Sequence, residues 1–210
     1  MKILVVEDHA FMLDAYRSNL EPFFSGQIFY SSNITDAICT FNKNPEISLV
    51  FVDLFFPGTT SISGTGIDFC KHLRSANPEV KIVIISAVTE SIIIYDIIKV
   101  VNPEGFLAKS DCNSAIFKEC LNSIFSEIYY SQYIKTALQT ISSLSPFMDQ
   151  INRKILMLLN QGVKNKNICD HVMLSLSAID KRKSLIKDYL GIEGDDETLL
   201  KEARNRGFIS

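Results

Sequence analysis

Polar side chains follow four apolar segments in the N-terminal part of the chain, where strands are expected to end. Glu7 and Asp8 follow "KILVV", Asp53 closes "ISLVFVD", Ser86 closes "KIVIIS", and Lys109 follows "GFLA". An isolated buried carboxylate is costly to keep charged, so it needs a partner, a metal or a solvent-facing position at the end of a strand. If the strands are parallel, their carboxyl ends converge on one crevice, and we expect these side chains to meet there.

The chemistry of such a cluster follows from its charges. Three carboxylates repel one another unless a cation joins them, and oxygen ligands with open positions suit Mg²⁺. A carboxylate beside Mg²⁺ can attack a phosphoryl group in line, because such transfer depends mainly on positioning and charge neutralisation. Lys109 would then neutralise one phosphoryl oxygen, and the Ser86 hydroxyl would hydrogen-bond another.

Short apolar runs alternate with helix-period segments through the first part of the chain, which is typical of repeated βα units around a parallel sheet. The predicted strands are 2–7, 27–32, 47–53, 81–87 and 104–109. The predicted helices lie near 10–21, 34–43, 66–76, 89–101 and 111–128. The pattern predicts a five-stranded, doubly wound α/β domain of the flavodoxin-like type over residues 1–128.

Composition sets the broad class of the protein. The 210 residues can hold two domains, and 47% hydrophobic residues are enough for packed cores, so disorder is not expected as the main state. Residues 1–144 carry 10 Lys+Arg against 15 Asp+Glu, net −5, and residues 145–210 carry 11 against 9, net +2. The acidity therefore belongs to the first two thirds of the chain.

The cysteines and the N-terminus indicate a compartment. The five cysteines are scattered without a CxxC pair and read as reduced core residues, neither a disulfide framework nor a zinc site. Met1 leads directly into "KILVVED", with no basic leader, cleavage site or long apolar span. We expect a cytoplasmic protein without a membrane segment.

The motifs "VVED", "VDLFFPG", "ISA" and "EGFLAK" together resemble the receiver domain of two-component response regulators, over residues 1–128. The resemblance implies that Asp53 accepts a phosphoryl group from a sensor histidine kinase. It also implies an Mg²⁺ site made by Glu7, Asp8, Asp53 and the backbone carbonyl of Phe55.

Other positions of the first domain also match that family. Ser86 and Lys109 match its hydroxyl and lysine positions, and Phe106 matches its aromatic switch position. In the family the hydroxyl moves toward the phosphoryl group and the ring turns inward, so that one charge event selects between two packings.

Two stretches depart from the family pattern. The segment 58–68 is longer than usual and borders the site, where it could cover the site or contact a partner. Phe55 and Val88 are apolar where some relatives are polar, and their bulk should hinder attacking water. We therefore expect slow autodephosphorylation and no enzyme activity beyond self-phosphorylation on Asp53. Phosphatases of the haloacid-dehalogenase type need a second carboxylate at the position of Phe55, which disfavours that alternative.

The remaining residues predict a linker and a helical domain. Residues 129–146 are polar and Ser/Thr-rich, as a linker would be, with some helical potential. Helices are predicted at 148–162, 164–172, 175–191 and 196–207. A short helix, a tight turn and a longer basic helix outline a helix-turn-helix.

Residues 147–210 resemble the LuxR-type DNA-binding domain of NarL/FixJ response regulators, through the spacing of "ILMLLNQGVKNKNICDHVMLSLSAIDKRKSLIKDYLGI". The resemblance implies that the third of these helices lies in the major groove of double-stranded DNA. The candidate contacts with the DNA backbone are Asn165, Lys166, Lys183 and Lys187. The candidate base-facing residues are Asp180, Lys181 and Ser184.

The base-facing positions also depart from the family. Asp180 stands where relatives usually have Lys, and Arg182 replaces a common His. An Asp can accept a hydrogen bond from cytosine, but it also repels phosphates. One such domain makes few phosphate contacts, so a homodimer is expected when the protein is phosphorylated. The chain is thus expected to be a phosphorylation-switched transcription regulator. The alternative is a receiver-based protein-interaction regulator whose C-terminal domain does not bind DNA.

Overall fold

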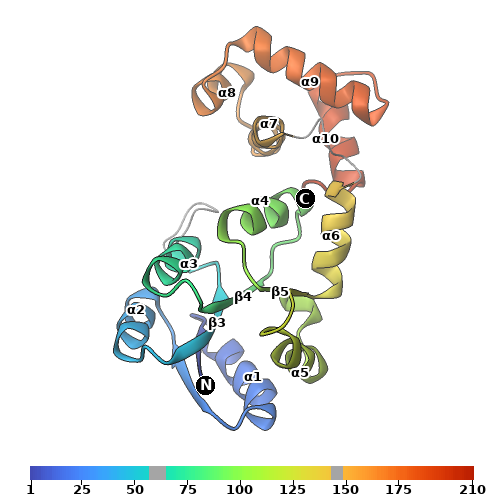
Figure 1. Ribbon diagram of the computed structural model, residues 1–210. Coiled ribbons are helices and arrows are strands. Elements are labelled where there is room, and N and C mark those ends of the chain that lie inside the picture. The colour runs from blue at the N-terminus through green and yellow to red at the C-terminus, as the bar shows by residue number, and fades with distance from the viewer. Residues whose placement is uncertain (57–64, 143–148) are drawn as a thin grey trace. The chain divides into compact units, whose positions relative to one another are not determined.

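The computed structural model describes residues 1–56, 65–142 and 149–210 (Figure 1). The long segment 58–68 lies mostly outside these residues. The chain divides into two compact units. The first consists of Met1–Val88 and Asp96–Lys135, and the second consists of Thr89–Tyr95 and Thr136–Ser210.

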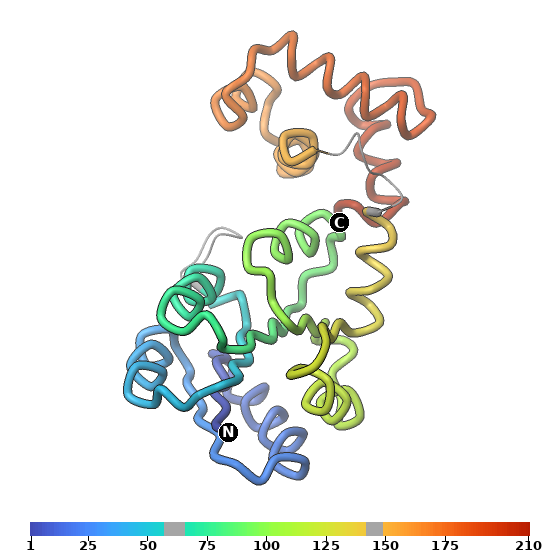
Figure 2. The backbone as a smooth tube through the Cα atoms, in the orientation of Figure 1, coloured from blue at the N-terminus to red at the C-terminus, as the bar shows by residue number. Residues whose placement is uncertain are grey.

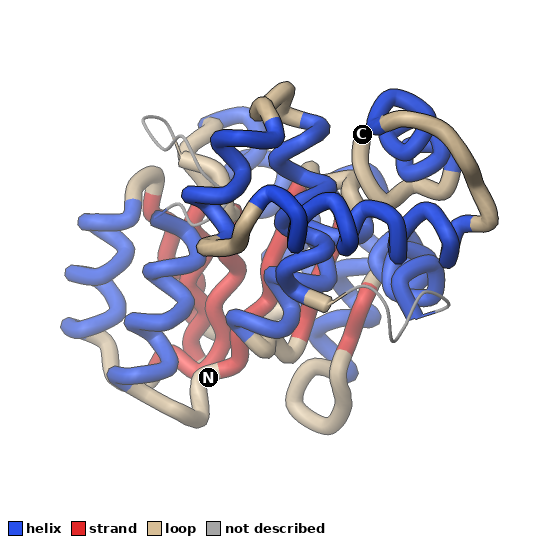
Figure 3. Tube along the Cα trace, turned by 90° about the horizontal axis from the view of Figure 1, so that it is seen from above, coloured by secondary structure: helices blue, strands red, loops and turns tan. Residues whose placement is uncertain are grey.

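The first unit is built on a parallel sheet with the strand order β2-β1-β3-β4-β5-β6, seen as the red strands in Figure 3. Its strands are β1 (Lys2–Val6), β2 (Gln27–Ser31), β3 (Ile47–Asp53), β4 (Lys81–Ser86), β5 (Gly105–Ala108) and β6 (Tyr129–Tyr130). Strands β3, β4 and β5 are buried almost along their whole length. Near-continuous apolar runs of this kind are expected where helices cover both faces of a sheet.

The five predicted strands are confirmed as β1 to β5, and β6 adds a sixth strand at the edge that was not predicted. Tyr129 N–H donates to Glu104 O at 2.8 Å, and Ser131 N–H donates to Phe106 O at 3.0 Å. β6 has only two residues, too few for an alternating pattern to reveal a strand in the sequence. The predicted linker also contains a helix, α6 (Gln132–Ser142), which begins in the first unit and continues into the second.

The helices predicted for the α/β domain are confirmed, with ends that differ by up to a few residues; the backbone can be followed through them in Figure 2. They are α1 (Ala10–Leu20), α2 (Ile34–Lys43), α3 (Thr65–Ala76), α4 (Ser91–Val101) and α5 (Ser114–Ser123). Asn33 and Asn113 cap the starts of α2 and α5 by accepting hydrogen bonds from backbone N–H groups. Two short 3₁₀ helices, η1 (Glu21–Phe23) and η2 (Lys109–Asp111), follow α1 and β5.

Helices α1 and α5 pack together against one face of the sheet. The aromatic rings of Tyr16 on α1 and Phe51 on β3 both contact the ring of Phe117 on α5, with centroid distances of 5.8 and 5.9 Å. This packing holds the start of α1 next to Glu7 and Asp8, which directly follow β1.

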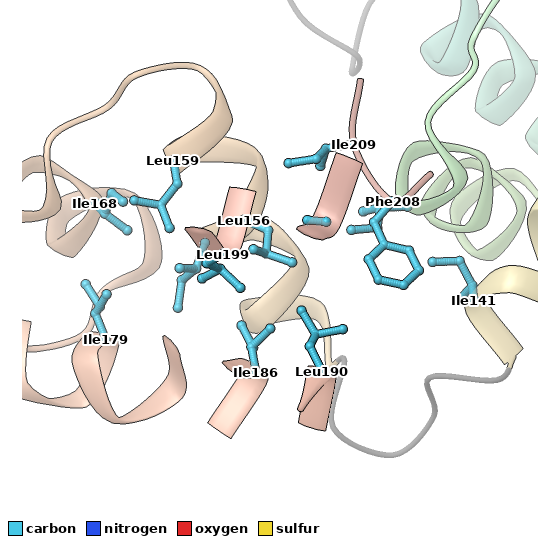
Figure 4. Packing of buried hydrophobic residues seen from close by; sticks show 13 residues of the cluster. Ile141, Leu156, Leu159, Ile168, Ile179, Ile186, Leu190, Leu199, Phe208 and Ile209 are labelled. Carbon is cyan, nitrogen blue, oxygen red and sulfur yellow. The ribbon is translucent and has the colours of Figure 1, made fainter. Parts of the chain in front are cut away.

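The second unit is helical, as predicted for its C-terminal part. It contains the start of α4, the later part of α6, α7 (Gln150–Asn160), α8 (Asn165–Val172), α9 (Leu176–Leu190) and α10 (Asp196–Asn205). Figure 4 shows Leu156, Ile186 and Leu199, from α7, α9 and α10, facing one another in its core. None of the helices in residues 1–56, 65–142 and 149–210 is long and apolar enough to cross a membrane.

A tight turn joins α8 to α9. Met173 adopts the left-handed conformation (φ 54°) and ends α8, and the Ser175 side chain accepts a hydrogen bond from Ala178 N–H to start α9. α9 ends at Gly191, which has φ 67°, a conformation that glycine adopts without strain. The predicted helix-turn-helix geometry is therefore formed.

Candidate functional site

The strand order reverses between β1 and β3, because β2 lies on one side of β1 and β3 lies on the other. At such a switch point the loops after the two strands separate and leave a crevice at the carboxyl ends. Glu7 directly follows β1 and is fully buried, and Asp53 is the last residue of β3 and 3% exposed. The sheet therefore brings these two carboxylates to the same edge.

Lys109 joins the two carboxylates. Its Nζ donates to Glu7 Oε2 and to Asp53 Oδ2, each at 2.8 Å. Lys109 is the first residue of η2, directly after β5. In the sheet β5 and β1 lie on opposite sides of β3, so Lys109 and Glu7 reach the crevice from opposite sides. Asp53 Oδ1 accepts a further hydrogen bond from Phe55 N–H at 3.2 Å.

Asp8 and His9 complete the acidic cluster. Glu7, Asp8, His9 and Asp53 each place one possible ligand atom within 4.8 Å of the others. Asp8 Oδ1 is buried and has no hydrogen-bond partner among the described residues, although His9 Nδ1 lies 2.9 Å away. His9 was not predicted as a site residue. The signal in the sequence that could have identified it is that it directly follows Glu7 and Asp8.

The carboxylates of this cluster differ in acidity. Burial raises the pKa of Asp53, and the hydrogen bond from Lys109 offsets only part of this effect, so its pKa lies above the ordinary value. Burial also acts on Glu7, but hydrogen bonds from Lys109 and His9 outweigh it and hold its pKa below the ordinary value. The hydrogen bond to Glu7 and the charge of Asp8 raise the pKa of His9.

Ser86 lies in β4, next to the strand of Asp53, and Phe106 lies in β5, on the other side of β4. Ser86 is the last residue of β4, is fully buried, and accepts a hydrogen bond from Val88 N–H at 3.2 Å. Phe106 lies in β5 opposite Ile84 of β4, and its ring is fully buried. Phe55, two residues after Asp53, has a partly exposed side chain.

The predicted DNA-contacting residues fall into two groups in the second unit. In the first group, Lys183 is 6% exposed and donates to Asp196 Oδ2 at 2.9 Å, and Asn165 donates to the same oxygen at 3.2 Å. Lys187 donates to Gly194 O at 2.8 Å. Asp196 therefore ties α8, α9 and α10 together, a role that no local pattern in the sequence indicated.

The second group is exposed. Lys166 lies on α8, and Asp180, Lys181 and Ser184 lie on the outer side of α9. Asp180 Oδ1 lies 3.0 Å from Lys183 Nζ, one turn along the helix. The structure thus leaves Lys166, Lys181 and Ser184 available to a ligand and directs Asn165, Lys183 and Lys187 to intramolecular partners.

The sequence matches the family of the response regulator receiver domain over residues 3–119, more than half of the chain. No curated protein matches it.

Solved structures of one response regulator, RcsB, share the fold along nearly the whole chain. RcsB of Salmonella typhimurium is 19% identical with a TM-score of 0.62, over 98% of each chain. An RcsB–DNA complex is 18% identical with a TM-score of 0.66, over 100% of this chain and 99% of that one. RcsB of Salmonella enterica serovar Typhimurium, bound to a promoter with the phosphomimetic BeF3-, is 20% identical with a TM-score of 0.65, over 96% and 97%.

Proposed function

Because the chain belongs to the response regulator receiver domain family, we propose that it is a phosphorylation-switched, DNA-binding transcription regulator of a two-component system in the cytoplasm. A sensor histidine kinase would supply the phosphoryl group, and Asp53 would accept it. The observation that carries this proposal is the contact of Lys109 with both Asp53 and Glu7 at the switch point of the sheet.

The surroundings of Asp53 suit an acceptor of phosphoryl groups. Its carboxylate is fixed by Phe55 N–H at one oxygen and by Lys109 at the other, so it cannot rotate freely. Phosphoryl transfer requires an aligned nucleophile and positive charge near the transferred oxygens. The Lys109 ammonium, which the two carboxylates keep protonated by raising its pKa against the effect of burial, supplies that charge.

The acidic cluster fits a divalent cation. The carboxylates of Glu7, Asp8 and Asp53 outnumber the single Lys109 ammonium, and the buried Asp8 Oδ1 has no hydrogen-bond partner among the described residues. Oxygen ligands of this kind suit Mg²⁺, which we propose is held by these carboxylates and the Phe55 backbone carbonyl. When bound, Mg²⁺ would reduce the repulsion between the carboxylates and an incoming phosphoryl group.

Ser86 and Phe106 are the proposed switch residues. Both are fully buried, Ser86 in β4 beside the strand of Asp53 and Phe106 in β5, the next strand of the sheet. A phosphoryl group on Asp53 would offer a new acceptor to the Ser86 hydroxyl, which now accepts from Val88 N–H. Movement of that hydroxyl changes the space beside the Phe106 ring, and a packed core responds to such a change by adopting a second discrete arrangement.

DNA binding is proposed for the helix-turn-helix formed by α8 and α9. Lys166 would contact phosphates, and Lys181 and Ser184 would face base edges from α9. One solved RcsB structure of the same fold is a complex with DNA, and a second contains two RcsB dimers bound to two parallel DNAs. We propose that this chain, too, binds DNA as a homodimer when phosphorylated.

A second candidate function is that of a protein-interaction regulator whose helical unit does not bind DNA. Met173, Leu176 and Leu185 are exposed on the turn and on α9, and Asp180 and Asp188 are exposed on the same helix. Apolar and acidic groups are unfavourable at a DNA phosphate backbone. The two functions are distinguished by binding to one preferred DNA sequence with an affinity that falls as salt rises, which only the first predicts.

Beyond self-phosphorylation on Asp53 and slow autodephosphorylation, we propose no catalytic activity. Phe55 stands two residues after the acceptor, where a dehalogenase-type phosphatase requires a second carboxylate, and its side chain is apolar. Hydrolysis of the acyl phosphate would need water that this side chain hinders.

The decisive experiment is intact mass spectrometry after incubation with acetyl phosphate and Mg²⁺. We expect one phosphoryl adduct that requires Mg²⁺ and that is lost in Asp53→Asn. The matched control is Asp68→Asn, because Asp68 is an exposed carboxylate on α3 that pairs along its own helix with Lys71. An adduct that persists in Asp53→Asn, or no adduct on folded wild-type protein, would contradict the proposal.

A further inference from the structure

Tyr16 differs from every other tyrosine of the chain in its position. All seven tyrosines lie within the described residues, and Tyr16 is the one that is buried, with 2% of its surface exposed. Its hydroxyl donates a hydrogen bond to Glu7 Oε2 at 3.2 Å. A buried phenol requires a partner for its hydroxyl, and here that partner is a carboxylate of the acidic cluster.

The direction of the Tyr16 hydroxyl is fixed by packing. The ring lies 5.8 Å from the ring of Phe117 at 59°, and Phe117 in turn packs against Phe51 of β3. Tyr16 therefore connects the aromatic core under α1 and α5 to the edge of the sheet where Glu7 lies. A donor held in this way is preorganised, because it has no other orientation available within a packed core.

Glu7 needs such a restraint more than an aspartate would, because its side chain has one more rotatable bond. Its Oε1 accepts a hydrogen bond from His9 N–H at 3.3 Å. Its Oε2 accepts from Lys109 and from Tyr16. Lys109 is shared with Asp53, so Tyr16 is the donor to Oε2 that serves Glu7 alone.

The two donors to Oε2 also differ in charge. The Lys109 ammonium neutralises Glu7, whereas a phenol orients the carboxylate and leaves its negative charge in place. When Lys109 turns toward a phosphoryl oxygen, the Tyr16 hydrogen bond still holds Glu7 toward the crevice. A group that hydrogen-bonds to a metal ligand without contacting the metal itself sets the orientation of that ligand and its affinity for the metal.

We propose that Tyr16 is a positioning residue that holds Glu7 in the orientation required to bind the divalent cation. This inference rests on the metal site proposed above. It extends that site to α1, and it explains why a tyrosine hydroxyl is buried beside an acidic cluster.

The test compares Tyr16→Phe with Tyr30→Phe in the full-length protein by calorimetric titration with Mg²⁺ at pH 7. Tyr30 is a matched control, because its hydroxyl also donates to a glutamate, Glu21, at 3.2 Å, but away from the cluster. We expect the Kd for Mg²⁺ to rise about tenfold in Tyr16→Phe, at the lower end of the range for such partners. Tyr30→Phe should leave the Kd unchanged.

A double-mutant cycle separates this role from a general loss of packing. Glu7→Asp shortens the carboxylate and withdraws it from the Tyr16 hydroxyl, so adding Tyr16→Phe to Glu7→Asp should change the Kd less than twofold, well below its effect on the wild type. Circular dichroism without Mg²⁺ checks folding, which the retained ring of Phe should preserve. If Tyr16→Phe alone does not fold, the cycle is completed with Tyr16→Met, and the same attenuation in the Glu7→Asp background is expected.

Two outcomes would overturn the inference in distinguishable ways. If the wild type binds Mg²⁺ and folded Tyr16→Phe binds it with the same Kd, Tyr16 does not position Glu7 and the proposed function stands. If the folded wild type does not bind Mg²⁺, the proposed metal site itself is wrong and the role of Tyr16 falls with it.

Discussion

Lys109 Nζ lies 2.8 Å from Asp53 Oδ2, although 56 positions separate the two residues in the chain. The same ammonium lies 2.8 Å from Glu7 Oε2, so one cation holds two buried carboxylates at the edge of the sheet. Lys109 therefore compensates part of the negative charge of both carboxylates.

Lys109→Met should destabilise the first unit. Removing the ammonium leaves Glu7 and Asp53 buried beside each other without a compensating charge, a change that costs about 3 kcal/mol at the lower end of the range for buried pairs. Saturating Mg²⁺ should recover part of this loss, because the ion restores positive charge at the same place. The measurement is urea unfolding with and without Mg²⁺.

Lys71→Met is the control for that experiment. Lys71 is exposed and pairs with Asp68 along α3, and exposed pairs of this kind contribute about 0.3–0.5 kcal/mol. A loss for Lys109→Met no larger than that of Lys71→Met would show that the bridge does not compensate the buried charges.

Ser131→Ala should weaken the edge of the sheet. Ser131 Oγ accepts a hydrogen bond from the buried Ala108 N–H at 3.1 Å, one residue before Lys109. Without this acceptor the N–H group is buried and unsatisfied, which costs about 1–3 kcal/mol. Urea unfolding with hydrogen exchange of the β5 peptide measures the effect. Ser126→Ala removes an exposed hydroxyl nearby and should change stability by less than about 0.5 kcal/mol. Equal losses of stability in Ser131→Ala and Ser126→Ala would contradict the role of Ser131 as the acceptor for Ala108 N–H.

The stability of the helical unit should depend on Asp196 and on pH. Burial raises the pKa of Asp196, but hydrogen bonds from Lys183 and Asn165 outweigh it, so its pKa in the folded protein lies below its ordinary value. A carboxyl with a lowered pKa contributes stability at neutral pH that is lost as pH falls through the folded value. Asp196→Asn should therefore cost about 1.5 kcal/mol at pH 7, within the range for hydrogen bonds to charged groups. The cost should decrease progressively below about pH 4.

The measurement is hydrogen exchange at a series of urea concentrations. Peptides from α8 to α10 report the stability difference between wild type and Asp196→Asn in the helical unit, separately from the sheet. Asp188→Asn is the control, since Asp188 is exposed on α9. A difference between wild type and Asp196→Asn that stays constant from pH 7 to pH 3 would show that the charge of Asp196 does not stabilise the unit.

Lys166→Ala and Lys181→Ala should affect DNA binding in different ways. If Lys166 contacts a phosphate, its removal weakens binding to all sequences and lowers the salt slope by about 1. If Lys181 faces bases, its removal costs about 1–3 kcal/mol on the selected sequence and relaxes the preference. Fluorescence anisotropy at several salt concentrations, after selection of a preferred sequence, measures both. Lys201→Ala on α10 is the exposed control. Unchanged binding in both variants would contradict these two contacts, whereas a wild type without salt-dependent, sequence-selective DNA binding would favour the protein-interaction alternative.

The sequence determined the local elements and the set of residues at the strand ends. Apolar runs and helical periods report which face of a segment is buried, and this information is local, so strands β1 to β5 and helices α7 to α10 could be predicted. The convergence of Glu7, Asp53 and Lys109 could also be predicted, because parallel strands bring their carboxyl ends to one edge.

Only the tertiary structure decided which partners these residues have. The hydrogen bond from Tyr16 to Glu7 depends on how α1 packs over the sheet. The hydrogen bond from Lys183 to Asp196 depends on where α10 lies beside α9. The two-residue strand β6 depends on β5 offering free backbone groups at the edge. Such contacts join residues of different helices and strands, and a pattern of burial along one segment does not specify which atoms of another segment it meets.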